Sequence, residues 1–505
     1  MNNLTFNNPI PSDGFTDRMR NRAQKLARIC APAIALTLMA THSVSSLADD
    51  IADVPLSVVS GADPNILFVL DDSGSMQREV TPGIFRVART FPVPADNLFG
   101  GSDTQEFVAW PFAGANEGFN TNLGGAVLQD ARATAIRFRS VAANTSYYDP
   151  SVTYIPWVAA DGTPFPDADP QAALHNPARP GKGARNLTVQ QSDFARYNAV
   201  DGNGQGIGGV TGTFSYFPAR YYHFEGAEGD DLTDPDNYQE VLIQAGNAPF
   251  TGQGRDQRTD CSLPNTCTYE EEIQNFANWY SYYRARLLAA QATIGLAFND
   301  LSEDVRVGFG TINHSGSVDG VNGRAVTEGV RAFDVQSRET FYDELYNRRF
   351  SNRGTPLRTA LRGAGNYFER ADARGPWSDS PGQSGNTDFL SCRKSFTILM
   401  TDGFWNGNNP NVGNVDSAPG NTITGPNNDD FTYSPVTPFT DDANNTLADV
   451  AMDYWNRDLL PNTENLVPTN DINPAFWQHM VTFGVAFGVE GNVNPEQAFA
   501  AIDPE

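Results

Sequence analysis

The segment Asn65–Leu70 is mostly apolar and runs directly into an acidic, hydroxyl-rich loop, residues 71–75 (DDSGS). A short apolar segment that ends so abruptly predicts a buried parallel strand followed by a tight turn. Asp71, Ser73 and Ser75 alternate at a spacing of two, so one turn can direct all three side chains to a common point. Carboxylate and hydroxyl oxygens suit a hard divalent cation, Mg²⁺ first, with Mn²⁺ or Ca²⁺ as alternatives. For this loop taken alone, a solvated turn that merely ends a strand is the competing interpretation.

Two later segments favour the metal site. Thr355 stands at the expected start of a helix, and Asp402 follows a second apolar strand, residues 396–401. The order D-x-S-x-S, then T, then D resembles the metal-ion-dependent adhesion site of von Willebrand factor A domains. The resemblance implies that Asp71, Ser73, Ser75, Thr355 and Asp402 hold the cation and leave one position open for an acidic side chain of a protein ligand. Asp72 is expected to be an exposed neighbour rather than a ligand.

Periodicity predicts the rest of an α/β fold. Apolar residues recur at steps of three and four from Ile273 to Phe298, which predicts one long helix, and Thr268 with Glu271 forms a capping box before it. Further strands are predicted at residues 305–312, 329–333, 396–401 and 480–487, and helices at 341–350, 357–368 and 445–459. Strands that alternate with helices predict a doubly wound, mostly parallel sheet with ligands at the carboxyl ends of its strands. Asp71 and Asp402 are both expected at such ends.

A long stretch after the first strand interrupts this pattern. Residues 77–267 are rich in Gly, Pro, Asn, Asp and aromatic residues, which predicts a large irregular, partly β insertion. The predicted organisation is therefore residues 1–48 as an extension with a signal peptide and 49–76 as the start of the A domain. The insertion follows at 77–267, the remainder of the A domain at 268–495, and a short tail at 496–505.

The amino-terminal segment predicts an exported protein. Basic residues precede an apolar segment at 29–39, and the small residues 46–48 form a cleavage site, which together predict a signal peptide. Cys261 and Cys267 bracket a short loop and are expected to form a disulfide in an oxidising compartment; zinc is the alternative, but no histidine is near the pair. Cys392 has no obvious partner. No other segment predicts a membrane span, and a net charge of -26 argues against a nucleic-acid partner.

Four phrases resemble a more specific family. They are residues 275–284 (NFANWYSYYR), 307–313 (VGFGTIN), 445–451 (NTLADVA) and 477–480 (WQHM). They are similar to the amino-terminal half of the PilY family of type IV pilus biogenesis and tip-adhesin proteins, and the resemblance covers roughly residues 60–495. Members of that family continue into a β-propeller with a calcium-binding loop, which this sequence does not contain.

The resemblance implies a metal-dependent binding protein of the type IV pilus system, located in the periplasm, at the pilus tip or on the cell surface. Minor pilins and host or surface molecules are the implied partners. A structural pilus-assembly subunit without a host ligand is one alternative, and a secreted hydrolase is another. Enzyme activity is not expected, because the sequence has no H-E-x-x-H, G-x-S-x-G or phosphate-binding loop and its five histidines are scattered. His479 is expected to be a packed or edge histidine.

Overall fold

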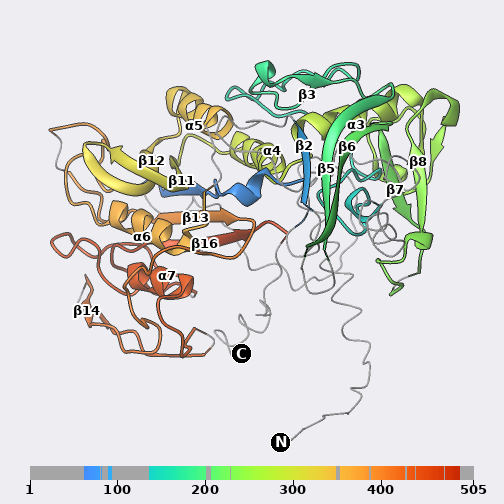
Figure 1. The fold of residues 1–505 in the computed structure, drawn as a ribbon. Helices are drawn as coiled ribbons and strands as arrows, with labels where there is room; N and C mark the ends of the chain where they lie inside the picture. Colours follow the sequence, from blue (N-terminus) through green and yellow to red (C-terminus); the bar gives the residue numbers. More distant parts are fainter. Residues whose placement is uncertain are drawn as a thin grey trace, which may run out of the picture.

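Figure 1 shows the computed structural model of the chain, in which helices surround a mostly parallel sheet. The structure describes residues 62–79, 81, 89–93, 136–200, 206–227, 229–348, 353–385, 388–426, 429–437, 439–470 and 472–488. The predicted signal peptide within residues 1–48 and the predicted tail at 496–505 lie outside the described residues.

The central sheet has five strands in the order β12-β11-β1-β13-β16. They are β1 (Asn65–Leu70), β11 (Arg306–Val318), β12 (Val321–Ala332), β13 (Ser395–Thr401) and β16 (Val481–Ala486). β1 pairs in parallel with β11 and β13, and β13 pairs in parallel with β16. Of these five strands, β12 alone runs antiparallel, to β11. The predicted mostly parallel sheet is therefore confirmed.

Helices cover both faces of this sheet. They are α4 (Arg286–Asn299), α5 (Val335–Asn347), α6 (Leu357–Phe368) and α7 (Leu447–Trp455). Alternate residues of β1 enter two different cores, because side chains of a strand point to opposite faces in turn. Phe68 packs in the core that contains residues of α4 and α5, whereas Val69 packs in the core that contains residues of α6 and α7. Figure 1 shows these two helix pairs on opposite sides of the sheet.

The prediction of one long helix from Ile273 to Phe298 is wrong, because the structure divides it into α3 (Tyr269–Tyr282) and α4. Tertiary hydrogen bonds replace helical ones at the junction. The Tyr282 carbonyl accepts a hydrogen bond from Trp157 Nε1 at 3.1 Å, and the Arg286 amide donates to the Arg78 carbonyl at 3.0 Å. The predicted capping box at Thr268 and Glu271 is confirmed.

Four other elements differ in extent from their predictions, and one of them is β11, which continues to Val318 instead of ending at residue 312. Helix α5 begins at Val335, six residues before its predicted start, with Asp334 as its cap. Helix α7 is shorter than predicted and begins after a capping box at Thr446. Strand β12 is much longer than predicted, because Asp319 and Gly320 adopt positive φ angles of 53° and 83° in a tight hairpin turn. An Asp-Gly turn of this kind is a strong hairpin signal, and it pairs even the polar first half of β12 with β11.

Small antiparallel sheets occupy the chain between β1 and α3. A three-stranded sheet contains β2 (Arg89–Val93), β5 (Gln191–Val200) and β6 (Gly206–Tyr216). Two-stranded pairs are β3 (Ala173–Leu174) with β4 (Ala184–Arg185), β7 (Arg220–Phe224) with β8 (Tyr238–Leu242), and β9 (Phe250–Thr251) with β10 (Thr266–Cys267). A further pair, β14 (Ile423–Thr424) with β15 (Asp430–Phe431), lies in the loop after β13.

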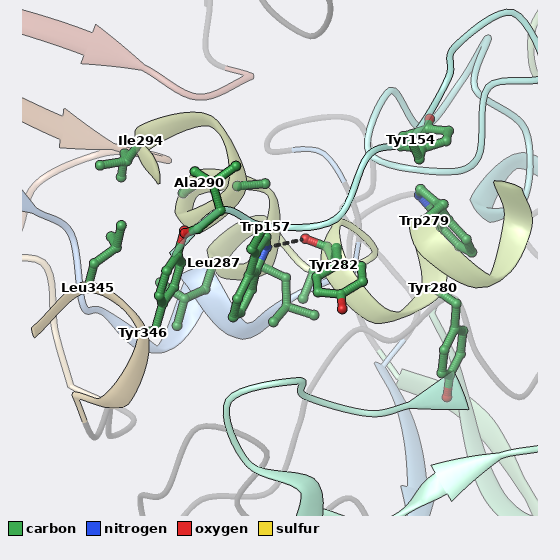
Figure 2. Close-up of a cluster of buried hydrophobic side chains, with 14 of the residues drawn as sticks. Tyr154, Trp157, Trp279, Tyr280, Tyr282, Leu287, Ala290, Ile294, Leu345 and Tyr346 are labelled. Carbon is green, nitrogen blue, oxygen red and sulfur yellow. Dashed lines mark hydrogen bonds between the residues drawn. The ribbon is translucent and has the colours of Figure 1, made fainter. Parts of the chain in front are cut away.

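Aromatic side chains join this region to the helices of the central sheet. Trp157 is fully buried and stacks on Tyr346 of α5, with ring centroids 4.6 Å apart and planes 5° apart. Figure 2 shows Trp157 between Tyr346 and Tyr282, beside Leu287 of α4. Trp157, Leu287 and Phe68 belong to one continuous hydrophobic core, so the residues between β1 and α3 share a core with the sheet.

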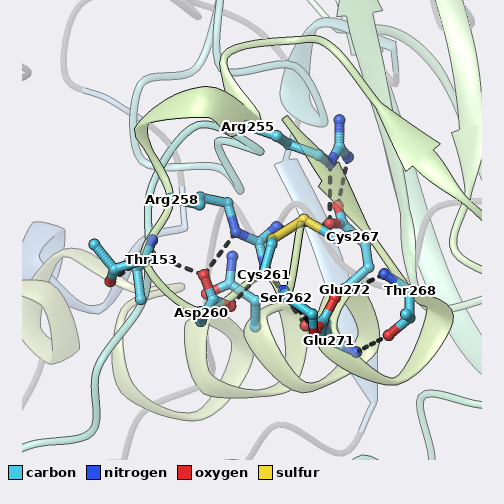
Figure 3. Close-up of a disulfide and its surroundings, with 12 residues drawn as sticks. Thr153, Arg255, Arg258, Asp260, Cys261, Ser262, Cys267, Thr268, Glu271 and Glu272 are labelled. Atoms are coloured by element: carbon cyan, nitrogen blue, oxygen red, sulfur yellow. Dashed lines mark hydrogen bonds and ion pairs between the residues drawn. A yellow bond between two sulfur atoms is a disulfide. The ribbon is translucent and has the colours of Figure 1, made fainter. Parts of the chain in front are cut away.

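A disulfide between Cys261 and Cys267 lies where this region returns to α3, with the two Cα atoms 4.9 Å apart (Figure 3). Beside it, Glu272 is completely buried and forms ion pairs of 2.6 Å with Arg255 and with Arg258. Both carboxylate oxygens are thereby satisfied, as a buried charge requires. Cys392 is a free, half-buried thiol. Within the described part of the chain, no helix has the length and apolar character needed to cross a membrane.

Candidate metal site at the ends of β1 and β13

Two neighbouring parallel strands bring Asp71 and Asp402 to the same edge of the sheet. Leu70 of β1 pairs with Met400 of β13, so the residues that follow each strand emerge side by side. The Asp71 amide continues the ladder by donating to the Met400 carbonyl at 2.9 Å. Asp71 and Asp402 are 0% and 1% exposed, so both carboxylates are held inside the protein.

A continuous set of hydrogen bonds links four of the five predicted ligands. The Ser73 amide donates to Asp71 Oδ1 at 2.8 Å, which fixes the turn after β1. The Ser73 and Ser75 hydroxyls are 2.8 Å apart, and Ser75 Oγ donates to Asp402 Oδ1 at 2.8 Å. The oxygens of Asp71, Ser73, Ser75 and Asp402 therefore gather in one place.

The loop that carries Thr355 is tied to the same place by backbone hydrogen bonds. The amide of Gly74, between the two serines, donates to the Arg353 carbonyl at 3.0 Å. Asn406 makes two hydrogen bonds to Thr355, each of 2.8 Å. Its side-chain Oδ1 accepts from the Thr355 backbone amide, and its backbone amide donates to the Thr355 carbonyl. Thr355 is 7% exposed. The structure thus brings the loops of all five predicted residues together.

Glycine is required next to this clamp. A Cβ atom built on Gly354 would lie 2.5 Å from Asn406 Oδ1, closer than real contacts allow. Any larger residue at position 354 would displace the oxygen that holds the Thr355 amide. The close approach explains a glycine in the sequence before Thr355.

The two carboxylates oppose each other electrostatically. Burial raises the pKa of Asp71 to about 6, and repulsion from Asp402 adds to the effect. Hydrogen bonds from Ser73 and from Thr401 Oγ1, which donates to Asp71 Oδ2 at 2.7 Å, act in the other direction. The site therefore holds buried negative charge, which costs free energy. A nearby cation would lower that cost.

Arg286 supplies one positive charge to the site. Its Nη1 donates to Asp402 Oδ2 at 2.6 Å, and the two side chains are 3% and 0% exposed. Burial lowers the pKa of this guanidinium, while the charge of Asp402 acts to raise it. Arg286 is the first residue of α4, so the break between α3 and α4 places it here. Nothing in the sequence pattern singles out this arginine.

The expectation that Asp72 is exposed is wrong. Asp72 is 7% exposed, and its Oδ1 accepts hydrogen bonds from the amide and the Nδ2 of Asn313 at 2.9 and 3.0 Å. Asn313 Nδ2 also donates to the Gly354 carbonyl at 2.9 Å. Asp72 therefore ties the end of β1 to β11 and to the loop before α6, and burial raises its pKa.

The residues present fit a hard divalent cation. In the described ranges, no three His, Cys, Asp or Glu side chains form a group that could hold a metal. The donors would instead be the carboxylates of Asp71 and Asp402 and the hydroxyls of Ser73, Ser75 and Thr355. Oxygen donors of this kind are preferred by Mg²⁺, Mn²⁺ and Ca²⁺. The gathering of these carboxylate and hydroxyl oxygens in one mostly buried place is the structural observation that favours a cation among them.

His479 is packed, as predicted. It is 3% exposed, its Nδ1 lies 2.7 Å from the Trp477 carbonyl, and burial lowers its pKa to about 4. His223 and His314 lie on separate strands, β7 and β11. Among the described residues, no hydrogen bond joins a serine or cysteine to either histidine ring. His314 Nδ1 instead lies 3.0 Å from Arg348 Nη2.

Comparison with known proteins gives one consistent result. No family model matches the chain, and no solved structure matches it significantly. The chain is 28% identical to the type IV pilus biogenesis factor PilY1 of Pseudomonas aeruginosa strain PAK over 497 residues, which is 92% of this chain. The proteins of the same name from strains PAO1 and UCBPP-PA14 are also 28% identical, over 92% and 90% of this chain. The chain spans only 35% of the length of the first of these relatives. The resemblance predicted from short phrases is thus confirmed: along nearly its whole length, this chain is similar to PilY1 type IV pilus biogenesis factors.

Proposed function

We propose that this chain is an exported, metal-dependent binding module of the type IV pilus system. Its sheet and helices would form a von Willebrand factor A-like domain, and Asp71, Ser73, Ser75, Thr355 and Asp402 its metal-ion-dependent adhesion site. The observation that carries the proposal is the hydrogen-bonded set that runs from Asp71 through both serines to Asp402. The similarity to pilus biogenesis factors supports the cellular role.

The charges around the site favour an acidic ligand. Asp71 and Asp402 carry two negative charges, and Arg286 offsets one of them through its ion pair with Asp402. A bound Mg²⁺ would supply a Lewis acid, and the protein would cancel only one of its two positive charges. Ser73, Ser75 and Thr355 would orient it with neutral oxygens, and a carboxylate of a partner protein would complete the coordination. Binding would then need both the metal and the partner's acid.

The partner would be a minor pilin or a molecule on a host or abiotic surface. The relatives are named biogenesis factors, which favours a role in pilus assembly as the second candidate function. Binding of the purified chain to purified minor pilins, compared with its binding to cells, distinguishes assembly from adhesion. In either case EDTA should abolish binding and Mg²⁺ should restore it. The periplasm, the pilus tip and the cell surface are the proposed locations.

The decisive test is metal binding by the double variant Ser73→Ala/Ser75→Ala. Isothermal titration with Mg²⁺ should detect binding to the wild-type chain and none to this variant. In the variant, Asp402 Oδ1 loses the hydrogen bond from Ser75. The free energy of unfolding of the variant should therefore be only about 2 kcal/mol lower than that of the wild type. The variant therefore remains folded for the titration.

A matched control removes another hydroxyl pair. Thr422 Oγ1 and Thr432 Oγ1 lie 2.7 Å apart on the exposed part of the β14–β15 region. Thr422→Ala/Thr432→Ala should bind Mg²⁺ like the wild type. Undiminished Mg²⁺ binding by the serine variant would refute the site.

A further inference from the structure

The loop that follows Asp402 exposes two aromatic side chains. Phe404 is 87% exposed, the highest value among the large apolar side chains of the described residues, and Trp405 is 46% exposed. Both come directly after Asp402 and Gly403. We call this pair the aromatic rim. An exposed aromatic pair beside a binding site indicates a contact surface for a partner.

The aromatic rim is held in place from both sides. Before it, Asp402 is fixed by Ser75 and by Arg286. After it, Asn406 is clamped to Thr355 through two hydrogen bonds of 2.8 Å. Phe404 therefore lies on a segment that is anchored two residues away on each side. These anchors hold the backbone of the loop in the conformation that exposes the Phe404 side chain.

One positive charge contacts the aromatic rim, although the whole chain has a net charge of -26. The guanidinium of Arg358 lies 3.5 Å from the centre of the Trp405 ring and is fixed by a hydrogen bond of 2.8 Å from its Nη1 to the Asn445 carbonyl. Arg353 is exposed on the loop that bonds to Gly74. Arg358 is 8% exposed and holds the Trp405 ring in place, while the exposed Arg353, close to Thr355 in sequence, offers a positive charge that complements an acidic partner.

We propose that the aromatic rim and the metal site form one surface for a protein segment that carries an acidic side chain next to an apolar one. The inference rests on the proposed function, because the acid would bind the cation. Phe404 is two residues from Asp402, a reach of at most about 7 Å along the chain. The apolar residue of an extended partner must therefore stand within one to three positions of its Asp or Glu. Phe404 and Trp405 select the apolar residue, and the cation selects the acid.

Selection from a library of random peptides displayed on phage, on the immobilised full chain in Mg²⁺, identifies the preferred segment. Recovered peptides should pair Asp or Glu with an aromatic or aliphatic residue at this spacing. Their affinities are then measured by fluorescence polarisation. Phe404→Ala should weaken binding at least 10-fold, because the exposed ring would be removed from water only in the complex. Mg²⁺ titration of Phe404→Ala should match that of the wild type.

Leu263→Ala is the matched control, since Leu263 is also an exposed apolar residue, 62% exposed, but lies on the disulfide loop. It should bind the peptides like the wild type. Equal affinity of Phe404→Ala and wild type, or failure to recover peptides with the paired acid and apolar residue, would overturn the proposal. A wild-type dimer that Phe404→Ala converts to monomer in sedimentation velocity would also overturn it, since the rim would then contact a second copy. If Phe404→Ala weakens binding but EDTA does not, the metal-dependent function fails while the rim remains a binding surface.

Discussion

Replacing Arg286 with glutamine tests how charge is balanced at the metal site. The Arg286 and Asp402 side chains are almost fully buried and only 2.6 Å apart. Without metal, Arg286→Gln leaves the Asp402 carboxylate without this cationic partner, which should lower the free energy of unfolding by about 3 kcal/mol. The same change removes a positive charge that repels a bound cation.

The gain in metal affinity can be estimated from Coulomb's law. A unit charge about 8 Å from a divalent cation is worth about 4 kcal/mol at an effective dielectric constant of about 20. The Kd for Mg²⁺ should therefore fall by up to about 1,000-fold in Arg286→Gln. Saturating Mg²⁺ should then restore more stability to the variant than it adds to the wild type, because tighter binding to the folded state stabilises it further.

Isothermal titration gives the Mg²⁺ affinity, and urea denaturation with and without Mg²⁺ gives the two stabilities. Arg286→Lys is the control, because it keeps the charge while changing the hydrogen-bond geometry. Its Mg²⁺ affinity should remain close to that of the wild type. Unchanged or weaker Mg²⁺ binding by Arg286→Gln, in a variant that is still folded, would refute this account of the charge balance.

Three further predictions concern other parts of the chain. Asn406→Ala should weaken Mg²⁺ binding about 10-fold in a titration, because the Thr355 loop loses its clamp; Asn414→Ala, which removes a comparable bond to the Asp441 carbonyl, should not. The pKa of His479 lies at about 4 in the folded chain, below its usual 6.5, so the unfolded chain binds the extra proton and stability falls as pH decreases from 6.5 towards 4. Urea denaturation should find about 2 kcal/mol less stability at pH 5 than at pH 7 from this residue, a difference absent from His479→Asn. Cys261→Ser/Cys267→Ser should lose about 2 kcal/mol of stability under non-reducing conditions, as expected for opening a six-residue separation; equal stability of the variant and the oxidised wild type would contradict this.

Features encoded by adjacent residues could be predicted from the sequence. β1 and the loop after it are contiguous in the sequence. Their burial and the convergence of Asp71, Ser73 and Ser75 can therefore be predicted from one short segment. The capping box at Thr268 is equally local, and it is present as predicted. Parallel pairing of β1 and β13 then brings Asp402 to the same place.

The partners that complete the site could not be predicted, because they are distant in sequence. Arg286 and Asp402 are separated by 116 positions, and Asn406 and Thr355 by 51. The break between α3 and α4 has the same origin. Apolar spacing continues across it, but Trp157, 125 positions away, takes the carbonyl that would continue the helix. The burial of Asp72 could not be predicted either, because its partner Asn313 lies on another strand.

The stacking of Trp157 on Tyr346 also limits how the chain can be divided. Because the sheet helices and the region before α3 share a core, we expect both to melt in one cooperative transition: neither part can lose its contacts without exposing the other. Excision of residues 77–267 would uncover the aromatic face of α5 and leave an aggregation-prone remnant in place of a minimal domain. A substitution of Trp157 at the base of that region should therefore be tolerated only together with a compensating change in its partner Tyr346 on α5.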